Sequence, residues 1–329
     1  MCIPYTSCAA PRPESCSFSA DLAAPQSVAA ISSWTSIGLR GMTRRTPQAL
    51  MQGRPMVRLI FSDLDDTFLA ADKTIPDANR AMLEEASRKN IQFVPCTGRN
   101  INGIPASIAE YGCVHYAVCC NGALVADLDR GEVIHEVDIE KEEVHRLFCA
   151  LKDLPITFDL FADSHVLTAE DRWHFLDEIP VTEPTRIHIK EVRTCYPGSV
   201  EDMIDAAKNI CRINIFYLDN ETRDKVWKIV DSFSDLIRAS SQPCNVEVTK
   251  NGADKGAGLL WLADHLGVPV EETVAFGDSS NDIAMLKAAG DGVAVANARP
   301  ECLAAADHIA QSNDKGGVGL YMEELLRRQ

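Results

Sequence analysis

The sequence lacks long hydrophobic runs and paired-cysteine motifs. No apolar stretch approaches the roughly 20 residues that a membrane-spanning helix needs. The chain has twelve cysteines, and no two of them have the two-residue spacing of a zinc or redox motif. A disulfide framework is not expected in a chain this long and this rich in hydrophobic residues. We therefore expect no membrane span, and cysteines that are buried, reduced thiols.

Excess positive charge is also missing. The 329 residues include 32 Lys and Arg against 48 Asp and Glu, a net charge of -16. A general nucleic-acid binder would carry a basic face, so no nucleic-acid partner is expected. With 46% hydrophobic and 24% charged residues, the composition is that of a soluble globular protein. We expect a cytoplasmic protein with a small-molecule partner, and the oligomeric state stays open.

The first 55 residues differ in composition from the rest. They contain five arginines, eight serines and no lysine, and Glu14 and Asp21 are their only acids. Apolar periodicity is weak and prolines recur, so residues 1–55 are predicted to be a disordered extension. An Arg- and Ser-rich, acid-poor leader also fits an organellar transit peptide. A start of the folded protein near Met56 is the preferred interpretation.

From residue 56 onward, expected strands alternate with expected helices. Strands are predicted at 57–62, 91–99, 115–125, 272–278 and 291–296, and helices at 76–89, 255–267, 281–290 and 318–328. This alternation is typical of right-handed crossover units on a parallel sheet. The predicted fold class is therefore α/β. Its Rossmann-like parallel-sheet core comprises residues 56–124 and 244–329, and residues 125–243 form an inserted α/β cap module.

Four polar clusters fall at predicted strand ends or helix starts. They are "DLDDT" at 63–67, "CTGR" at 96–99, "DKG" at 254–256 and "GDSSND" at 277–282. Ligands bind at the carboxyl ends of strands in open parallel sheets, so these clusters are expected to meet at one edge.

Converging carboxylates are tolerated when a divalent cation lies among them. A set of oxygen ligands without histidine suits Mg²⁺, and Asp63, Asp65 and Asp278 are the natural candidates. Lys255 would supply a fixed positive charge, and Thr97 would donate to phosphoryl oxygens. A nucleophilic carboxylate inside an anion site indicates phosphoryl transfer through an aspartyl-phosphate.

These four motifs, in this order, resemble those of the haloacid dehalogenase-like phosphatases, close to the Cof-type class IIB hydrolases. Members of that family begin with Asp-x-Asp-Gly-Thr, then carry Ser/Thr-Gly-Arg, a lysine, and Gly-Asp-x-x-Asn-Asp. The stretches "EVTKNGADKG" and "AVANARPECLAAADHIAQSNDKGGVG" also resemble the C-terminal half of the family. The resemblance covers residues 56–329, and residues 125–243 match mainly by position.

The resemblance implies a role for each motif residue. Asp63 would be the nucleophile, and Asp65 the general acid and then the base. Thr97 and Lys255 would hold the phosphoryl group. The metal would be bound by Asp63, the main-chain carbonyl of Asp65 and Asp278, with Asp282 supporting it. The residues expected near the phosphoryl group or substrate are Gly98, Arg99 and Asn281.

The first motif departs from the family pattern at one position. Asp66 replaces the usual glycine. Glycine permits a positive φ, and aspartate tolerates one better than most residues do. We expect activity to survive, with an added charge beside the metal.

The resulting prediction is a Mg²⁺-dependent phosphatase that acts on a small phosphorylated metabolite, either a sugar phosphate or a phosphorylated cofactor. Two alternatives remain from the sequence. One is a sugar phosphomutase using the same intermediate, and the other is a non-catalytic metabolite-binding module.

Overall fold

The computed structural model describes residues 56–329, which belong to one compact unit. The predicted extension, residues 1–55, lies outside the described residues. Within residues 56–329 no helix combines the length and the hydrophobicity required to cross a membrane.

A five-stranded sheet forms the first part of the fold, and all of its neighbouring strands pair in parallel. In the order β14-β13-β12-β1-β2, its strands are His308–Ala310, Asp291–Val295, Thr273–Gly277, Leu59–Ser62 and Gln92–Pro95. The central strands β1 and β12 are buried along their whole length, as expected for a parallel sheet covered on both faces. The predicted α/β class with a parallel-sheet core is confirmed.

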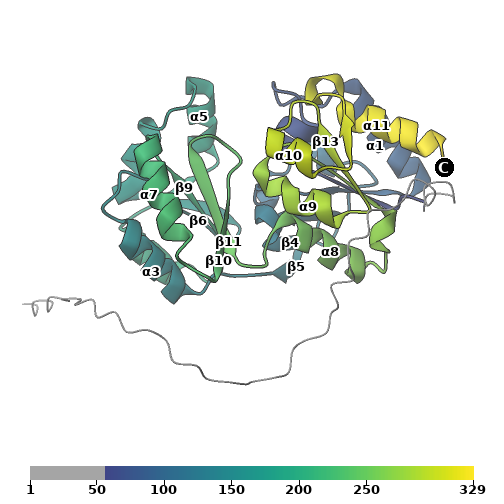
Figure 1. The fold of residues 1–329 in the computed structure, drawn as a ribbon. Coiled ribbons are helices and arrows are strands. Elements are labelled where there is room, and N and C mark those ends of the chain that lie inside the picture. Colours follow the sequence, from purple (N-terminus) through teal and green to yellow (C-terminus); the bar gives the residue numbers. More distant parts are fainter. Residues whose placement is uncertain (1–55) are drawn as a thin grey trace, which may run out of the picture. The chain divides into compact units, whose positions relative to one another are not determined.

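Helices cover this sheet (Figure 1). They are α1 (Asp77–Lys89), α2 (Ala106–Ala109), α8 (Lys255–His265), α9 (Ile283–Ala288), α10 (Pro300–Ala305) and α11 (Gly317–Arg327). Helix α9 contacts both α8 and α10, and α1 packs against α11. The helix α1 begins directly after Pro76 and ends at Lys89, because the next residue, Asn90, has a left-handed backbone (φ 54°) that stops the helix.

A six-stranded sheet lies in the middle of the sequence. In the order β10-β11-β9-β6-β7-β8, its strands are Leu236–Ala239, Asn245–Lys250, Ile210–Phe216, Asp159–Ala162, His165–Ala169 and Thr194–Tyr196. Its helices are α3 (Lys141–Leu151), α4 (Glu170–Trp173), α5 (Glu183–Glu191), α6 (Val200–Ala206) and α7 (Asn220–Val230), and α3 packs against α6 and α7.

The two sheets have separate hydrophobic clusters. The cluster of the six-stranded sheet contains residues between Ile139 and Val248, and that of the five-stranded sheet contains residues from 57–125 and 259–325. The cap module, expected at 125–243, stays a prediction as a domain. In the structure β11 (245–250) pairs with β9 and β10 and so extends the six-stranded sheet beyond residue 243.

The segment 115–125 does not form the single strand that its hydrophobicity suggests. It contains β3 (Tyr116–Cys119), a tight turn at Cys120–Gly122, and the start of β4 (Leu124–Asp127), which pair antiparallel and are joined by β5 (Glu132–Glu136). All three turn residues have positive φ angles. A Cβ on Gly122 would lie 1.9 Å from the carbonyl oxygen of Asp254, so the turn fits against the start of α8 only because this residue is glycine.

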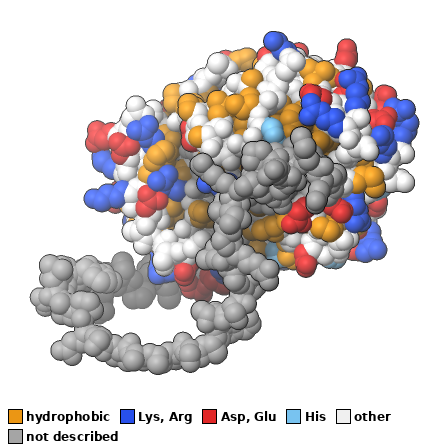
Figure 2. All heavy atoms as spheres, turned by 45° about the vertical axis from the view of Figure 1, so that its right-hand side comes forward, with side chains coloured by type: hydrophobic (Ala, Val, Ile, Leu, Met, Phe, Trp, Pro, Cys, Tyr) orange, Lys and Arg blue, Asp and Glu red, His pale blue; other side chains and the backbone are white. Residues whose placement is uncertain are grey.

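The nine cysteines of residues 56–329 are free thiols. Seven are buried, whereas Cys149 and Cys195 are exposed, so the expectation of burial holds for most of those described but not for all. The face drawn in Figure 2 carries charged side chains of both signs, interspersed with hydrophobic ones.

Asp138 lies on the segment 137–140, which connects β5 to α3. The neighbouring amides of Val137 and Ile139 donate to carbonyl oxygens of Ala123 and Ile210. Among the described residues, the buried Oδ1 of Asp138 has no hydrogen-bond partner. Burial, and the nearby acids Glu136 and Glu140, raise the pKa of Asp138 to about 6.

We expect Asp138→Asn to stabilise the protein at neutral pH. A carboxyl whose folded-state pKa is raised costs stability above that pKa, where it is ionised, and costs nothing below its unfolded-state pKa. The gain should be about 1 kcal/mol at pH 7.5, because the group is partly exposed to solvent, and should shrink as the pH falls from 6 towards 4. Urea unfolding at several pH values measures this difference. A gain that does not depend on pH would contradict the explanation.

Candidate functional site

The candidate site lies where β1 and β12 end, side by side. Asp63 directly follows β1 and Asp278 directly follows β12, and the amide of Asp63 donates to the carbonyl oxygen of Phe276 (3.0 Å). Lys255 is the first residue of α8, and Asp282 ends the short turn Ser280–Asp282 after β12. Residues 192 positions apart in the sequence thus meet at one sheet edge. Three of the four motifs predicted to converge, "DLDDT", "DKG" and "GDSSND", meet here in the structure.

Three carboxylates and one ammonium form the centre of the site. One carboxylate oxygen from each of Asp63, Asp278 and Asp282 lies within 4.8 Å of the others, and all three residues are buried. The Nζ of the fully buried Lys255 donates to Asp63 Oδ1 (2.7 Å) and Asp282 Oδ1 (2.6 Å). We call these four residues the acidic cluster.

The pKa values in the acidic cluster reflect its excess of negative charge. Burial raises the pKa of Asp63 well above its ordinary value; Lys255 opposes this, and the neighbouring carboxylates add to it. Burial and Asp282 raise the pKa of Asp278 to about 6. Burial alone would lower the pKa of Lys255, but Asp282 and Asp63 outweigh it and raise this pKa well above its ordinary value. Lys255 is therefore a fixed cation.

Asp282 holds Lys255 and the backbone at Asp278 in place through hydrogen bonds. Its Oδ1 accepts from Lys255, and its Oδ2 accepts from the amides of Asp278 and Ser279, at 2.9 Å each. A Cβ on Gly277 would lie 2.3 Å from the Cβ of Asp282. The end of β12 can therefore lie this close to Asp282 only because residue 277 is glycine.

Asp278 is oriented by two hydroxyl groups. Thr67 donates to its Oδ1 (2.9 Å) and Ser279 to its Oδ2 (2.8 Å). No role was predicted for Thr67, although it belongs to the motif "DLDDT".

The side chain of Asp65 does not join the acidic cluster. It forms a bidentate ion pair with Arg99, whose Nε and Nη2 each donate to one carboxylate oxygen at 2.8 Å. Its Oδ1 also lies 3.0 Å from Lys73 Nζ. Burial alone would raise the pKa of Asp65, but Arg99 and Lys73 lower it overall. The remaining terminal nitrogen of Arg99 donates to the carbonyl oxygen of Gly103. Substrate contact by Arg99 stays a prediction.

Asp66 has the positive φ that the family's glycine would favour, at 60°. Asn297 donates to its carbonyl oxygen and helps to hold this conformation. The departure from the family pattern therefore preserves the backbone of the turn.

Thr97 and Gly98 line the second strand end. Thr97 is buried, its amide donates to Val118, and its hydroxyl oxygen accepts from the amide of Arg99 (3.2 Å), which leaves the hydroxyl proton available to a ligand.

A polar network that the sequence did not indicate lies beside Gly98. Asn281 donates to Asn121 Oδ1 (3.1 Å), and Asn121 donates to Glu247 Oε2 (2.5 Å). Glu247 lies on β11, and its Oε1 is 3.4 Å from Nη1 of Arg212 on β9. Burial alone would raise the pKa of Glu247, but Arg212 and Asn121 lower it overall, so the pair is ionic. Glu247 belongs to the quoted stretch "EVTKNGADKG"; for Arg212 no sequence motif offers a signal.

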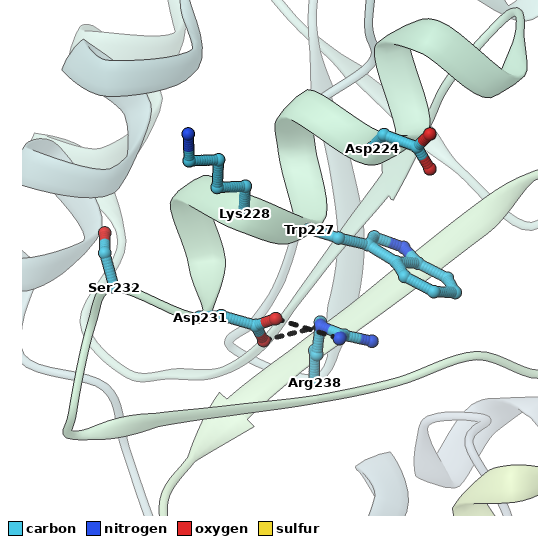
Figure 3. A pocket seen from close by; sticks show the side chains of 6 residues that line it. All are labelled: Asp224, Trp227, Lys228, Asp231, Ser232 and Arg238. Carbon is cyan, nitrogen blue, oxygen red and sulfur yellow. Dashed lines mark hydrogen bonds and ion pairs between the residues drawn. The ribbon is translucent and has the colours of Figure 1, made fainter.

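A surface hollow of about 420 Å³ lies elsewhere, on α7 and β10 (Figure 3). The ion pair of Asp231 and Arg238 lies in it, next to the ring of Trp227. Its described lining residues include no member of the acidic cluster, and it is not the candidate site.

The family is decided by comparison with known proteins. The family model described as haloacid dehalogenase-like hydrolase matches residues 60–322. The chain belongs to this family. It is 30% identical over 286 residues to the phosphatase YwpJ of Bacillus subtilis, covering 82% of this chain and all of that protein.

Two further relatives extend the comparison. The 5-amino-6-(5-phospho-D-ribitylamino)uracil phosphatase YwtE of Bacillus subtilis is 25% identical and covers 83% of this chain and 99% of that protein. A solved haloacid dehalogenase-like hydrolase from B. subtilis has a TM-score of 0.72 at 29% identity, covering 82% of this chain and 100% of the other. These findings confirm the predicted family and the prediction that the protein is a phosphatase.

The acidic cluster predicts a measurable response to divalent cations. Asp278→Asn removes one of three mutually repelling buried carboxylates, so in EDTA its melting temperature should rise by about 2–4 °C. Added Mg²⁺ should raise the melting temperature of the wild type and have much less effect on the variant. Differential scanning fluorimetry measures both effects. The exposed Asp264 supplies the control, since Asp264→Asn should behave like the wild type; an equal Mg²⁺ response in Asp278→Asn would contradict a metal site here.

Proposed function

We infer that this phosphatase is Mg²⁺-dependent and hydrolyses a small phosphorylated metabolite through an intermediate in which Asp63 carries the phosphoryl group. The observation that carries this proposal is the acidic cluster, a buried carboxylate held by a buried ammonium at a strand end. Relatives support the substrate class, because YwtE and a protein of Enterobacter named HMP-PP phosphatase both have names that specify small phosphorylated compounds.

The residues of the acidic cluster fit a divalent cation. When ionised, the three carboxylates together with the ammonium have a formal charge of -2. All the atoms of this cluster that could ligate a cation are oxygens, as Mg²⁺ prefers. Asp63, Asp278 and the main-chain carbonyl of Asp65 would hold the ion. Asp282 would act behind them, because it is fully buried and its oxygens already accept from the ammonium of Lys255 and from two backbone amides, whereas among the described residues the carboxylate of Asp278 accepts only from two hydroxyl groups. Bound Mg²⁺ supplies positive charge that reduces repulsion between the carboxylates and the phosphate ester.

In the first step, Asp63 attacks phosphorus. Its Oδ1 is engaged by Lys255, so Oδ2 is the attacking atom. A bond forms between Oδ2 and phosphorus while the bond to the leaving oxygen breaks. Lys255 and the hydroxyl of Thr97 stabilise negative charge on the phosphoryl oxygens.

Asp65 acts as the general acid in the first step and as the general base in the second. It gives a proton to the leaving oxygen in the first step, which requires its protonated form and separation from Arg99. In the second step it accepts a proton from the water that attacks phosphorus, and the P–O bond to Asp63 breaks. The pair with Arg99 and Lys73 favours the ionised form that the second step needs.

The six-stranded sheet and its helices would act as the cap over this edge. Glu247 and Ser240 of this part hydrogen-bond to Asn121 and Ser280 of the other. Closure would exclude bulk water and strengthen the electrostatic interactions around the phosphoryl group.

The proposed mechanism predicts that phosphate release depends on both metal and Asp63. The full-length protein should release inorganic phosphate from at least one member of a panel of sugar phosphates, flavin mononucleotide and pyridoxal 5′-phosphate in Mg²⁺. EDTA or Asp63→Asn should lower the rate by at least about 1,000-fold. Asp264→Asn serves as the control and should keep wild-type activity. Release that persists in EDTA and in Asp63→Asn would refute the mechanism, and an isomerised sugar phosphate without free phosphate would instead identify a mutase.

A further inference from the structure

Arg212 is a buried arginine whose hydrogen-bonding capacity is not used within the described residues. It lies on β9, is 4% exposed, and its guanidinium carbon is 3.7 Å from the centre of the Phe161 ring. Its Nε and Nη1 are buried and have no hydrogen-bond partner within residues 56–329. The ion pair with Glu247 balances its charge without satisfying these two donors.

A second arginine next to the same sheet, with a side chain only 6% exposed, shows what a structural role looks like. Arg193 precedes β8, and its guanidinium lies over the Phe216 ring. Its Nε and Nη2 donate to Asp159 (3.1 and 2.9 Å), and its Nη1 donates to the carbonyl oxygen of Ile189 (2.7 Å). All three nitrogens of Arg193 are thus satisfied. Buried donors without partners destabilise a fold, so the open donors of Arg212 point to a ligand.

One of the open donors, Nη1, lies against the loop that holds the phosphoryl group in the proposed function. A Cβ on Gly98 would be 2.7 Å from Arg212 Nη1 and 3.0 Å from Asn121 Oδ1. Gly98 therefore lets the guanidinium approach the backbone directly after Thr97. Arg212 reaches this loop from β9 of the six-stranded sheet, whereas the acidic cluster lies at the edge of the five-stranded sheet.

An unused acceptor belongs to the same network. Within the described residues, Asn281 Oδ1 is buried without a hydrogen-bond partner, while its Nδ2 donates to Asn121. The network around Asn121 thus includes two open donors, on Arg212, and one open acceptor, on Asn281. A hydroxyl group accepts one hydrogen bond and donates another, so it matches this arrangement.

We propose that Arg212 is a substrate-recognition residue that donates to a hydroxyl oxygen of the leaving group, next to the phosphoryl group, while Asn281 Oδ1 accepts from a leaving-group hydroxyl. This proposal rests on the proposed function and narrows its substrate to phosphate esters of sugars or sugar alcohols. The p-nitrophenyl group has no hydroxyl besides the leaving oxygen, so p-nitrophenyl phosphate offers no partner of this kind to Arg212 or Asn281.

The test compares two kinds of ester in one set of full-length proteins. We would measure kcat/KM for ribose 5-phosphate, glucose 6-phosphate and ribitol 5-phosphate, and for p-nitrophenyl phosphate. Arg212→Met should lower kcat/KM for the best sugar ester by about 10- to 100-fold, the value of one hydrogen bond to a charged group. For p-nitrophenyl phosphate it should change kcat/KM by less than about twofold. Arg212→Lys, which keeps the charge beside Glu247, should fall between.

Arg193→Lys is the matched control, because it alters an arginine with a largely buried side chain beside the same sheet and should leave the ratio of the two kcat/KM values unchanged. Thermal unfolding checks that each variant is folded. Equal losses on both ester types, or no loss on either, would overturn the role of Arg212. Wild-type activity confined to esters without hydroxyls would also overturn it while leaving the phosphatase intact. A wild type without phosphate release from any ester refutes the proposed function, and the proposal for Arg212 falls with it.

Discussion

The contact of Lys255 with Asp63 and Asp282 is the interaction on which the site depends. Its three residues come from the end of β1, the start of α8 and the turn after β12, and the ammonium is fully buried between the carboxylates. A buried charge without a partner is costly, so these elements are stable only in the positions that keep the three groups together. The geometry of the sheet edge and the electrostatics of the site are therefore one constraint.

Close backbone contacts transmit this constraint to the rest of the site. Because Gly277 has no side chain, Asp282 can lie against the strand end and hold the amide of Asp278. Because Gly122 has none, the turn 120–122 fits against the residue preceding Lys255. That turn fixes Asn121, which connects the core residue Asn281 to Glu247 of the six-stranded sheet. The start of α8 thus positions both the acidic cluster and the network around Asn121.

Strands and backbone angles that depend on residues adjacent in the sequence were predictable from the sequence. Turns and contacts that depend on residues far apart in the sequence were not. The strands β1, β2, β12 and β13 follow from short apolar runs, and the φ of Asp66 follows from local backbone preferences. The run at 115–125 is as apolar as these strands, but three successive positive φ angles break it, and that turn exists because α8 packs on it. The pair of Asp65 and Arg99 and the approach of Arg212 to Gly98 likewise depend on tertiary packing.

The two parts of the proposed site, the acidic cluster and the pair of Arg212 and Glu247, differ in net charge. With all three carboxyls ionised, the acidic cluster has a formal charge of -2, and it would act on the phosphoryl group, whereas the pair of Arg212 and Glu247 is neutral as a whole. A neutral pair adds directional donors without adding to the attraction for phosphate itself. Recognition of the leaving group then depends on hydrogen-bond geometry, which discriminates between substrates more sharply than net charge does. In the proposal, Arg212 on β9 and Asn281 in the turn after β12 select the leaving group, and the acidic cluster binds the phosphoryl group. Substitutions of Arg212 would therefore change the preferred ester without altering the residues proposed to carry out the chemistry.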